Sequence, residues 1–196
     1  MAFLRSAIGS FERADSLFGD ALYLRRPELS DYSDWADIRG RSRAFLTPWE
    51  PVWASDELTR TAYRRRLRRY SRDGRDGAGI AFFAFRAEDD RLVGGVTLSN
   101  IRRGAAAAAA IGYWVGADFA RRGYATEAAR LAIAFGFGPY RLNRIEAACL
   151  PENTASKALL QKIGFRQEGL ARQYLKIGGD WRDHLIFSLL KSEFRK

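Results

Sequence analysis

The chain has 196 residues, of which 47% are hydrophobic and 29% are charged, an ordinary composition for one globular domain with a full core. One cysteine and one histidine exclude an internal disulfide and a zinc site built on thiolates and imidazoles. The 33 Lys and Arg against 23 Asp and Glu give a net charge of +10, which favours polyanionic partners such as RNA, ribosomes or a phosphorylated cofactor.

The first residues are expected to form neither a membrane span nor a secretion signal. No stretch of about 20 apolar residues is present, and charges from Arg5 to Asp15 interrupt the segment where a signal needs an apolar centre. We therefore expect a cytoplasmic protein without membrane contact. Residues 1–20 lack clear periodicity and are expected to form an N-terminal arm, followed by a single domain over 21–196.

The order of the expected elements predicts the fold class. Hydrophobic periodicity, caps and turns predict, in the first half, strand 21–26, helix 30–43, an aromatic loop 45–53 and an arginine-rich helix that begins after Ser55 and ends near 72. Strands 80–86 and 92–100 follow, and then an alanine-rich loop that leads into a strand ending at 115. The second half is predicted to contain helix 126–137, strand 144–150, helix 154–163 and strands 165–176 and 182–190. A block of strands followed by strand–helix alternation predicts an α+β (mixed α/β) fold with one mixed sheet covered by helices.

The arginine-rich helix holds the densest positive charge in the chain. Apolar residues recur within it at helical spacing, which predicts an amphipathic helix. Its basic residues are Arg60, Arg64, Arg65, Arg66, Arg68, Arg69, Arg72 and Arg75. A solvated helix face is the simpler interpretation, and a contact with nucleic acid is the alternative.

A strand, a loop and a helix follow one another between Tyr113 and Ala128, and the loop contains Arg121, Arg122 and Gly123. A helix start leaves about four amide N–H groups unpaired and carries roughly half a positive charge, so such a loop can hold a phosphate. Gly123 lets the backbone come close to phosphate oxygens, and the arginines add charge. The alternative is an ordinary left-handed turn before a buried helix.

A second helix start follows at Asn153, a residue type that commonly caps helices. Ser156 lies one turn further on, where its hydroxyl either bonds back to the helix or faces a ligand. One helix and one strand separate the two helix starts along the chain, which puts both at the same end of the sheet.

These two helix starts and two further motifs resemble the GNAT acetyltransferases and, more narrowly, the ribosomal-protein-alanine N-acetyltransferases. The motifs are Arg-Arg-Gly-Tyr-Ala at 121–125, Asn153 and Ser156 followed by Gly-Phe at 164–165, the aromatic loop 45–53 and Trp-Arg-Asp-His at 181–184. The resemblance covers roughly residues 21–196. It implies one GNAT-type N-acetyltransferase domain with a central mixed sheet of about seven strands, flanked by about four helices.

The resemblance implies that acetyl-CoA binds in a split between two parallel strands, 113–115 and 144–149. Pantetheine would pair with the exposed edge of 111–115, and the pyrophosphate would rest on the amides of 121–126. The implied cofactor-binding residues are Tyr113, Trp114, Val115, Arg121, Arg122, Gly123, Tyr124, Ala125, Thr126, Asn153 and Ser156. No metal is expected.

Two positions depart from the family pattern. Gln or Arg often stands three residues before the central glycine, and Ala120 stands here, which leaves the pyrophosphate to the backbone and to Arg121 and Arg122. Many relatives carry a tyrosine seven residues after the motif asparagine as general acid on the CoA sulfur, and Leu160 stands here. In the ribosomal-protein subgroup the serine that matches Ser156 lies near the sulfur, so the resemblance gives Ser156 that role.

The implied chemistry is direct attack of a neutral amine on the thioester. A protein α-amine has a pKa of about 7.7–8.0, whereas that of a lysine is near 10.4, so a much larger fraction of the α-amine is unprotonated at cytoplasmic pH. An N-terminal acceptor therefore needs less help from a general base. Glu50, Glu146 and Glu152 are the candidate proton acceptors, although each carboxylate can also be a plain surface group. Glu50, in the aromatic loop, is taken with Ser156 as the catalytic pair.

Three other residue types attract attention. Trp49 and Trp53 are expected to wall the acceptor pocket, because two prolines hold their loop, and the alternative is that they cover the core between the first two helices. Cys149 lies within an apolar strand and is expected to be core rather than an acyl carrier. His184 is expected to pair with Asp183 rather than to act in catalysis.

The leading hypothesis is an N-terminal protein acetyltransferase that uses acetyl-CoA, with a ribosomal-protein alanine as acceptor and a basic surface that helps it meet ribosomes. A small-molecule acceptor, such as a polyamine, aminoglycoside or amino acid, is the second hypothesis, and a closed, acidic pocket would favour it. A non-catalytic RNA- or ribosome-binding module of the same fold is the third. A monomer or weak dimer is expected.

Overall fold

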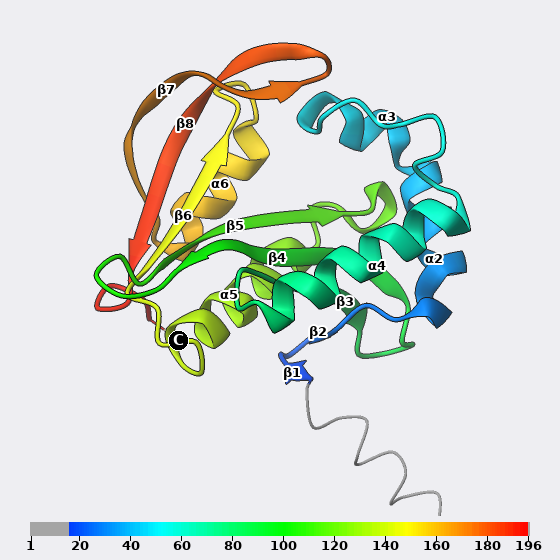
Figure 1. Cartoon of the computed structure of the whole chain (residues 1–196), viewed down its shortest axis with the longest axis horizontal. Helices are drawn as coiled ribbons and strands as arrows, with labels where there is room; N and C mark the ends of the chain where they lie inside the picture. Colours follow the sequence, from blue (N-terminus) through cyan, green and yellow to red (C-terminus); the bar gives the residue numbers. More distant parts are fainter. Residues whose placement is uncertain (1–15, 196) are drawn as a thin grey trace, which may run out of the picture.

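An eight-stranded mixed sheet forms the centre of the computed structural model, which describes residues 16–195 (Figure 1). The strands lie in the order β1-β2-β3-β4-β5-β6-β8-β7. Their bounds are β1 (Leu17–Phe18), β2 (Leu22–Arg25), β3 (Ile80–Arg86), β4 (Leu92–Arg102), β5 (Ala108–Val115), β6 (Arg144–Cys149), β7 (Arg166–Ile177) and β8 (Asp180–Leu190). Neighbouring strands pair antiparallel, except that β5 and β6 are parallel.

Helices cover both faces of this sheet. They are α2 (Tyr32–Arg41), α3 (Arg43–Leu46), α4 (Arg60–Arg75), α5 (Tyr124–Phe137) and α6 (Thr154–Ile163), with the 3-10 turns η1 (Leu29–Asp31), η2 (Thr47–Trp49) and η3 (Ala117–Phe119). Phe135 of α5 meets Phe82 with ring centroids 5.4 Å apart, whereas Tyr63 of α4 meets Phe83 at 6.5 Å. Because successive strand residues point to opposite faces, α4 and α5 lie on opposite sides of the sheet. α6 contacts α5 and shares its side.

The parallel strands β5 and β6 separate soon after they begin. Residues 108–110 of β5 pair with 144–146 of β6. Further along, residues 111–115 pair with β4 on the other side, and 147–149 pair with β8. The two strands therefore open into a split whose walls are the facing backbone edges of β5 and β6.

Small residues bring α5 close to the sheet beside this split. Ala129 and Ala132 are fully buried against the strands. A Cβ on Gly136 would lie 3.1 Å from Ile145 and 3.2 Å from Leu98, so the glycine permits the close approach. The packing fixes the helix axis, and with it the position of the helix start.

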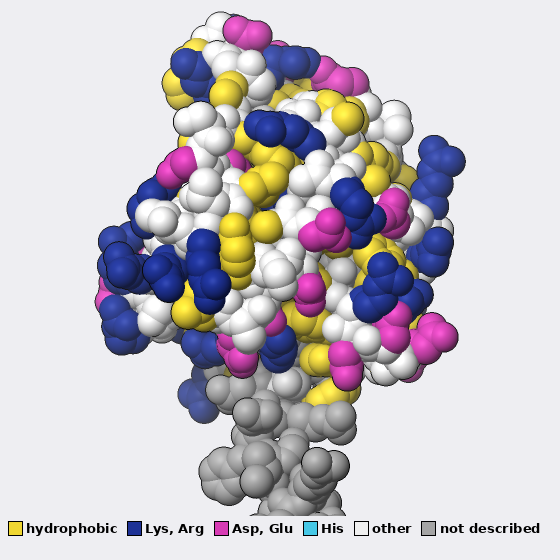
Figure 2. Space-filling view, turned by 90° about the vertical axis from the view of Figure 1, so that its right-hand side faces the viewer, with side chains coloured by type: hydrophobic (Ala, Val, Ile, Leu, Met, Phe, Trp, Pro, Cys, Tyr) yellow, Lys and Arg dark blue, Asp and Glu magenta, His cyan; other side chains and the backbone are white. Residues whose placement is uncertain are grey.

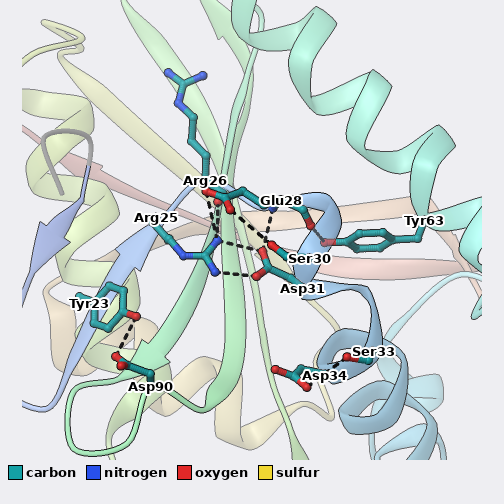
Figure 3. A network of polar contacts seen from close by, with 10 residues as sticks. All are labelled: Tyr23, Arg25, Arg26, Glu28, Ser30, Asp31, Ser33, Asp34, Tyr63 and Asp90. Atoms are coloured by element: carbon teal, nitrogen blue, oxygen red, sulfur yellow. Dashed lines mark hydrogen bonds and ion pairs between the residues drawn. The ribbon is translucent and has the colours of Figure 1, made fainter. Parts of the chain in front are cut away.

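A polar network joins the end of β2 to the start of α2 and to α4 (Figure 3). Arg25 donates to both carboxylate oxygens of Asp31, one of them at 2.9 Å, and Asp31 also accepts the backbone N–H of Glu28 at 2.7 Å. The Tyr63 hydroxyl donates to the Glu28 carbonyl at 2.7 Å, and burial raises the pKa of this phenol, which keeps its proton. The network sets where α2 leaves the sheet.

The expected architecture is confirmed, with a two-residue strand, β1, and a four-residue helix, α3, in addition to the elements expected. Of the arm expected over 1–20, residues 1–15 lie outside the described residues, while Leu17–Phe18 pairs with β2. None of the helices between residues 16 and 195 is long and apolar enough to cross a membrane.

The bounds expected for the arginine-rich helix and the structure expected for the aromatic loop are wrong. The arginine-rich helix begins at Arg60 rather than after Ser55, because Thr59 caps it and its hydroxyl accepts the Ala62 N–H at 3.2 Å. It also ends at Arg75 rather than near 72. The loop expected over 45–53 is partly helical, since α3 and η2 occupy its first half.

Candidate active site

Two neighbouring residues near the open end of β5 face opposite sides of the sheet. The hydroxyl of Tyr113 meets α6, whereas the ring of Trp114 lies 5.2 Å from the Arg39 guanidinium of α2. A Cβ on Gly95 would lie 2.7 Å from the indole nitrogen of Trp114, so a glycine is required for this ring to lie across β4. The open end of β5 therefore contacts both helical layers.

The loop before α5 presents backbone donors beside the split. Gly123 caps the helix in a left-handed conformation, with φ of +86°, and no side chain caps it. Glu127 donates its N–H to the Gly123 carbonyl at 3.0 Å, so the amides of Tyr124 to Thr126 precede the first intrahelical bond and point out of the helix start. A Cβ on Gly123 would meet nothing within 4 Å, so the space before these amides is open. This cradle fits a phosphate group.

The loop is held firmly to α2. The N–H of Ala117 donates to the hydroxyl of Ser42 at 2.9 Å, and Ser42 is buried. A Cβ on Gly116 would lie 2.5 Å from Ile38, so the loop packs directly on the helix. Arg41 forms an ion pair with Asp118 on the outside. The cradle is thus positioned by α2 as well as by β5.

The second helix start brings Ser156 to the split. The Asn153 side-chain oxygen accepts the Ser156 N–H at 3.0 Å and so caps α6, as the sequence predicts. The Ser156 hydroxyl oxygen lies 2.8 Å from the hydroxyl oxygen of Tyr113. Burial raises the pKa of Tyr113 to about 12, although the hydrogen bond with Ser156 lowers it, so the phenol is protonated at neutral pH. Tyr113 can therefore donate to Ser156, whose own proton is then free to point elsewhere.

Cys149 lies at the end of β6, next to the same serine. It is buried, as expected for a core residue, and burial raises the pKa of its thiol, an effect that Ser156 opposes by hydrogen bonding. A thiol held protonated is a poor nucleophile. The environment does not favour Cys149 as an acyl carrier.

On the other side of the sheet, a buried arginine organises the aromatic loop. Arg39 donates to both oxygens of Glu50, at 3.1 and 2.6 Å, and stacks 4.4 Å from the Trp53 ring. The Trp53 indole also donates to Glu50, at 2.7 Å. Only 5% of Arg39 is exposed, and its Nε has no hydrogen-bond partner among the described residues. The bidentate pair and the rings of Trp53 and Trp114 therefore stabilise the buried cation.

The β7–β8 hairpin reaches this loop, as Figure 1 shows at the end of the hairpin near α3. The Gly178 N–H donates to the Glu50 carbonyl at 3.1 Å. Apolar side chains remain exposed around this contact, including Trp49 (38%), Val52 (69%) and Trp181 (60%). An open, partly apolar surface of this kind suits an extended peptide better than a small cation.

The remaining acid and base candidates are engaged elsewhere. Glu146 forms hydrogen bonds with Arg144 and Arg102. Burial alone would raise the pKa of Glu146, but the hydrogen bonds from the two arginines outweigh this effect and lower it. Glu152 forms an ion pair with Arg182. His184 is buried, and its Nδ1 lies 3.0 Å from the carbonyl oxygen of Arg182 rather than bonding to Asp183 as expected.

The predicted site residues thus form two groups on either side of the split strands. The cradle at Gly123, Tyr113 and Ser156 lie towards α5 and α6, whereas Glu50 and Trp53 lie towards α2. Sequence reasoning missed the residue that joins the second group to β5, Arg39, because its acid partner is 11 residues away and no local pattern signals the pair. Among residues 16–195 no cluster of three or more His, Cys, Asp or Glu could hold a metal ion.

A sheet split between two parallel strands, with a phosphate cradle at the adjoining helix start, defines the class of coenzyme A-dependent acyltransferases. Comparison with known proteins agrees. The family described as "Acetyltransferase (GNAT) domain" matches residues 21–166. The "Probable N-acetyltransferase YjcK" of Bacillus subtilis (strain 168) is 35% identical over 177 residues, which cover 90% of this chain and 98% of the relative.

Two further matches have more specific descriptions. The "[Ribosomal protein uS5]-alanine N-acetyltransferase" of Escherichia coli (strain K12) is 32% identical over 170 residues, 87% of this chain and 88% of the relative. The structure of Mycobacterium smegmatis RimJ in complex with CoA-disulfide superposes with a TM-score of 0.85 at 34% identity, covering 89% of this chain and 84% of that one. The chain belongs to the GNAT acetyltransferase family, and the expectation from the motifs is confirmed.

Proposed function

We propose that the chain transfers the acetyl group of acetyl-CoA to the N-terminal α-amine of a protein, with a ribosomal-protein alanine as acceptor. The observation that carries the proposal is the split between β5 and β6, with an open cradle at Gly123 and the Ser156 hydroxyl beside it. The described activity of the Escherichia coli relative supports the choice of acceptor.

The cradle supplies the cofactor contacts. Bound acetyl-CoA supplies an activated acetyl group as a thioester. The amides of 121–126 hold the pyrophosphate, and Arg121 and Arg122, both exposed, add charge in place of the Gln or Arg that Ala120 replaces. The free backbone edge of 111–115, including Tyr113, Trp114 and Val115, pairs with the pantetheine amides in the split.

Ser156 donates a hydrogen bond to the leaving sulfur in this proposal. Its hydroxyl is oriented by Tyr113, whose phenol keeps its proton at neutral pH and donates to the serine oxygen. A positioned donor that meets charge as it develops lowers the barrier without needing to be a strong acid. Tyr113 and Ser156 together take the role that a tyrosine has in many relatives, at the position where this chain has Leu160.

Glu50 is a positioning residue in this proposal, and the catalytic role predicted for it is not retained. Arg39 and Trp53 together occupy both of its carboxylate oxygens with three hydrogen bonds. A carboxylate so engaged would have to release charge-assisted bonds before it accepted a proton. An α-amine is sufficiently neutral near pH 7 to attack after losing its first proton to water. As the C–N bond forms and the C–S bond breaks, the nitrogen releases its second proton through water and the departing CoA sulfur takes one up, so no protein base is required.

The acceptor approaches along the aromatic loop and the β7–β8 hairpin. The wall of the acceptor site is assigned to Trp49 and Trp53 in this proposal, and the exposed Trp181 lies on the hairpin. The exposed apolar surface supports a peptide over a polyamine or aminoglycoside, for which a closed acidic pocket is expected. A cytoplasmic location and a monomeric or weakly dimeric state stay predictions.

One assay tests the proposal. Acetyl-CoA consumption is measured against a panel of alanine-starting ribosomal-protein peptides, the same peptides with a blocked N-terminus, lysine peptides, polyamines and aminoglycosides, with mass spectrometry of each product. We expect acetylation at the free N-terminal alanine. Acetylation confined to small amines would replace the proposed acceptor, and binding of acetyl-CoA without turnover on any amine would favour the non-catalytic module.

A further inference from the structure

The outer face of α4 is a ridge of arginines with few acidic partners. Arg60, Arg64, Arg68 and Arg72 recur every four residues, so they line one side of the helix. Figure 2 shows a dense group of basic side chains at the left of its view, where α4 runs in front of the sheet in Figure 1. We call this set of four the arginine ridge.

The ridge is not neutralised within the described part of the chain. Neighbouring arginines of α4 are paired, Arg65 with Asp56 and Arg66 with Glu57, and Arg72 approaches Asp73 only to 3.7 Å. Between residues 16 and 195, Arg64 and Arg68 have no carboxylate within 4 Å. Like charges four residues apart on a helix destabilise it, so an isolated ridge of this kind calls for an anionic partner.

A cavity of about 370 Å³ opens beside the C-terminal half of α4, between this helix and the strands β3 and β4. Its lining is mixed, with a half-buried aromatic ring and several hydrogen-bonding groups. The polar side chains of this lining are Arg69, Tyr70, Asp73, Thr97, Ser99 and Asn100. Arg72 lies 3.7 Å from the Asp73 carboxylate and offsets its charge, and the Arg69 guanidinium lies 5.7 Å from the centre of the Tyr70 ring. A planar ring, two hydroxyls and an amide are suited to holding a nucleobase by stacking and hydrogen bonding.

The cavity is separate from the acetyl-CoA cradle. Ser99 pairs with Ala110, where β5 and β6 are still joined, whereas the open end of the split lies where Gly94 pairs with Val115. Five residues of strand, about 17 Å, separate the two places. Thr97 and Ser99 lie on the same face of β4 as Gly95, and the Trp114 ring packs over Gly95 on that face. The cavity therefore opens on the side of the sheet where the aromatic loop lies.

We propose that the arginine ridge and this cavity form an RNA-binding site, in which the arginines contact successive phosphates and one unpaired base stacks on Tyr70. The inference rests on the proposed function, because a ribosomal-protein acceptor lies next to ribosomal RNA. The site docks the enzyme on RNA adjoining the acceptor N-terminus. Duplex RNA can place its phosphates on the arginine ridge, but it cannot place a base in the cavity because its bases are stacked in pairs.

The charge contribution is tested by fluorescence anisotropy with a fluorescein-labelled single-stranded RNA of 12 nucleotides. The triple variant Arg64→Gln, Arg68→Gln, Arg72→Gln is compared with a control of equal charge change, Arg141→Gln, Lys162→Gln, Lys191→Gln. We expect the ridge variant to lose at least about tenfold in affinity and about 2 units of slope in log K against log salt, since each lost phosphate contact removes about 0.7. Equal losses in both triple variants would overturn the site.

The stacking contribution is tested at Tyr70. Tyr70→Leu is expected to weaken single-stranded RNA by about five- to a hundredfold, whereas Tyr70→Phe keeps the ring and the affinity, and neither changes binding of a duplex. Should Tyr70→Leu fail to fold, 2-aminopurine in the RNA reports stacking on the wild-type protein by quenching. An unquenched base, or equal binding to phosphatidylserine vesicles, would contradict the proposal.

The acetylation assay separates this inference from the proposed function. On a short alanine peptide, the ridge variant is expected to keep wild-type kcat and KM, while on intact ribosomal subunits its kcat/KM falls by at least about tenfold. If RNA binding depends on the ridge but the protein acetylates no peptide, the proposed function is wrong and the RNA site stands. Unchanged rates on subunits would remove the docking role.

Discussion

The hydroxyl oxygens of Tyr113 and Ser156 lie 2.8 Å apart, and their contact joins β5 to the first turn of α6. Tyr113 lies in the part of β5 that no longer pairs with β6, and Ser156 lies in the first turn of the helix that follows β6. The pair therefore stands beside the split, where the reacting thioester belongs in the proposed function. The hydroxyl of Ser156 is therefore held by a residue of β5. In the proposed function Tyr113 is therefore a positioning residue, and this role gives two linked predictions.

Replacing Ser156 by alanine is expected to lower kcat by about one to three orders of magnitude, because removing a positioned donor to a developing anion typically costs about 10²–10³ and the sulfur anion is a weaker acceptor than an oxyanion. Affinity for CoA changes little, because the cradle at Gly123 is untouched. Thr154→Ala, in the same exposed first turn, serves as the control. Steady-state kinetics and calorimetric titration with CoA measure the two effects, and an unchanged kcat would remove Ser156 from the mechanism.

Tyr113→Phe is expected to lower kcat by about tenfold, less than the loss in Ser156→Ala, because the serine hydroxyl survives without its orienting partner. The double variant is the decisive measurement. If Tyr113 acts through Ser156, the phenylalanine has no further effect in the alanine background, so the two free-energy changes are not additive. Additive losses in kcat would mean that Tyr113 acts independently of the serine.

The cradle is tested by Gly123→Val. A valine cannot adopt the φ of +86° without strain, and its side chain would fill the open space before the amides of α5. We expect CoA binding to fall below detection in calorimetry. Gly104→Val is the matched control, since Gly104 also has a positive φ, +64°, with open space around it, in the turn between β4 and β5. Retained binding in the Gly123 variant would show that the phosphate lies elsewhere.

The sequence predicts most of this fold because its signals are local. The glycine after the arginine pair, the asparagine cap and the alternation in the strands are read within a few residues. Even the run 105–110 leads into a strand rather than a helix, as predicted despite its helical propensity, although the strand already begins at Ala108 inside the expected loop. The split between the two parallel strands was expected only from the resemblance to the GNAT acetyltransferases. The start of α4 was misplaced because both Ser55 and Thr59 are acceptable caps, and only packing decides between them.

The polar contacts between elements could not be predicted in the same way. Glu50 looks like a free carboxylate in the sequence, and its partner Arg39 lies in α2, outside the aromatic loop, so the pair exists only after folding. The contact of Tyr113 with Ser156 likewise spans 43 residues. Residue types and caps thus indicate where chemistry occurs, while tertiary contacts decide which candidates are free to act.

Glu50→Gln separates a structural from a catalytic role. Loss of the carboxylate charge leaves Arg39 buried without its counter-ion, which is expected to cost about 2–3 kcal/mol in the free energy of unfolding, below the usual 3–5 because Glu50 is partly exposed. Urea unfolding measures this loss. At a temperature where the variant is folded, kcat on a peptide is expected to keep its pH profile. A kcat that collapses while stability is unchanged would restore Glu50 as the base.

The stability of the β6, β7 and β8 region is expected to depend on acid pH through Glu168. Hydrogen bonds from Arg144 and then Ser188 lower the pKa of Glu168 from its ordinary 4.5 to about 2. Because the folded pKa lies below the unfolded value, the stabilising contribution is complete above about pH 4.5 and is lost as pH falls towards 2. Glu168→Gln removes it at every pH.

The measurement is the difference in unfolding free energy between wild type and Glu168→Gln, from urea titrations between about pH 6 and pH 2.5. The difference is expected to be constant down to about pH 4.5 and to shrink below it, because protonated Glu168 resembles glutamine in charge. Glu88→Gln, in the exposed β3–β4 turn, controls for the change in net charge. A difference that stays constant to pH 2.5 would mean that the ion pair with Arg144 does not persist in solution.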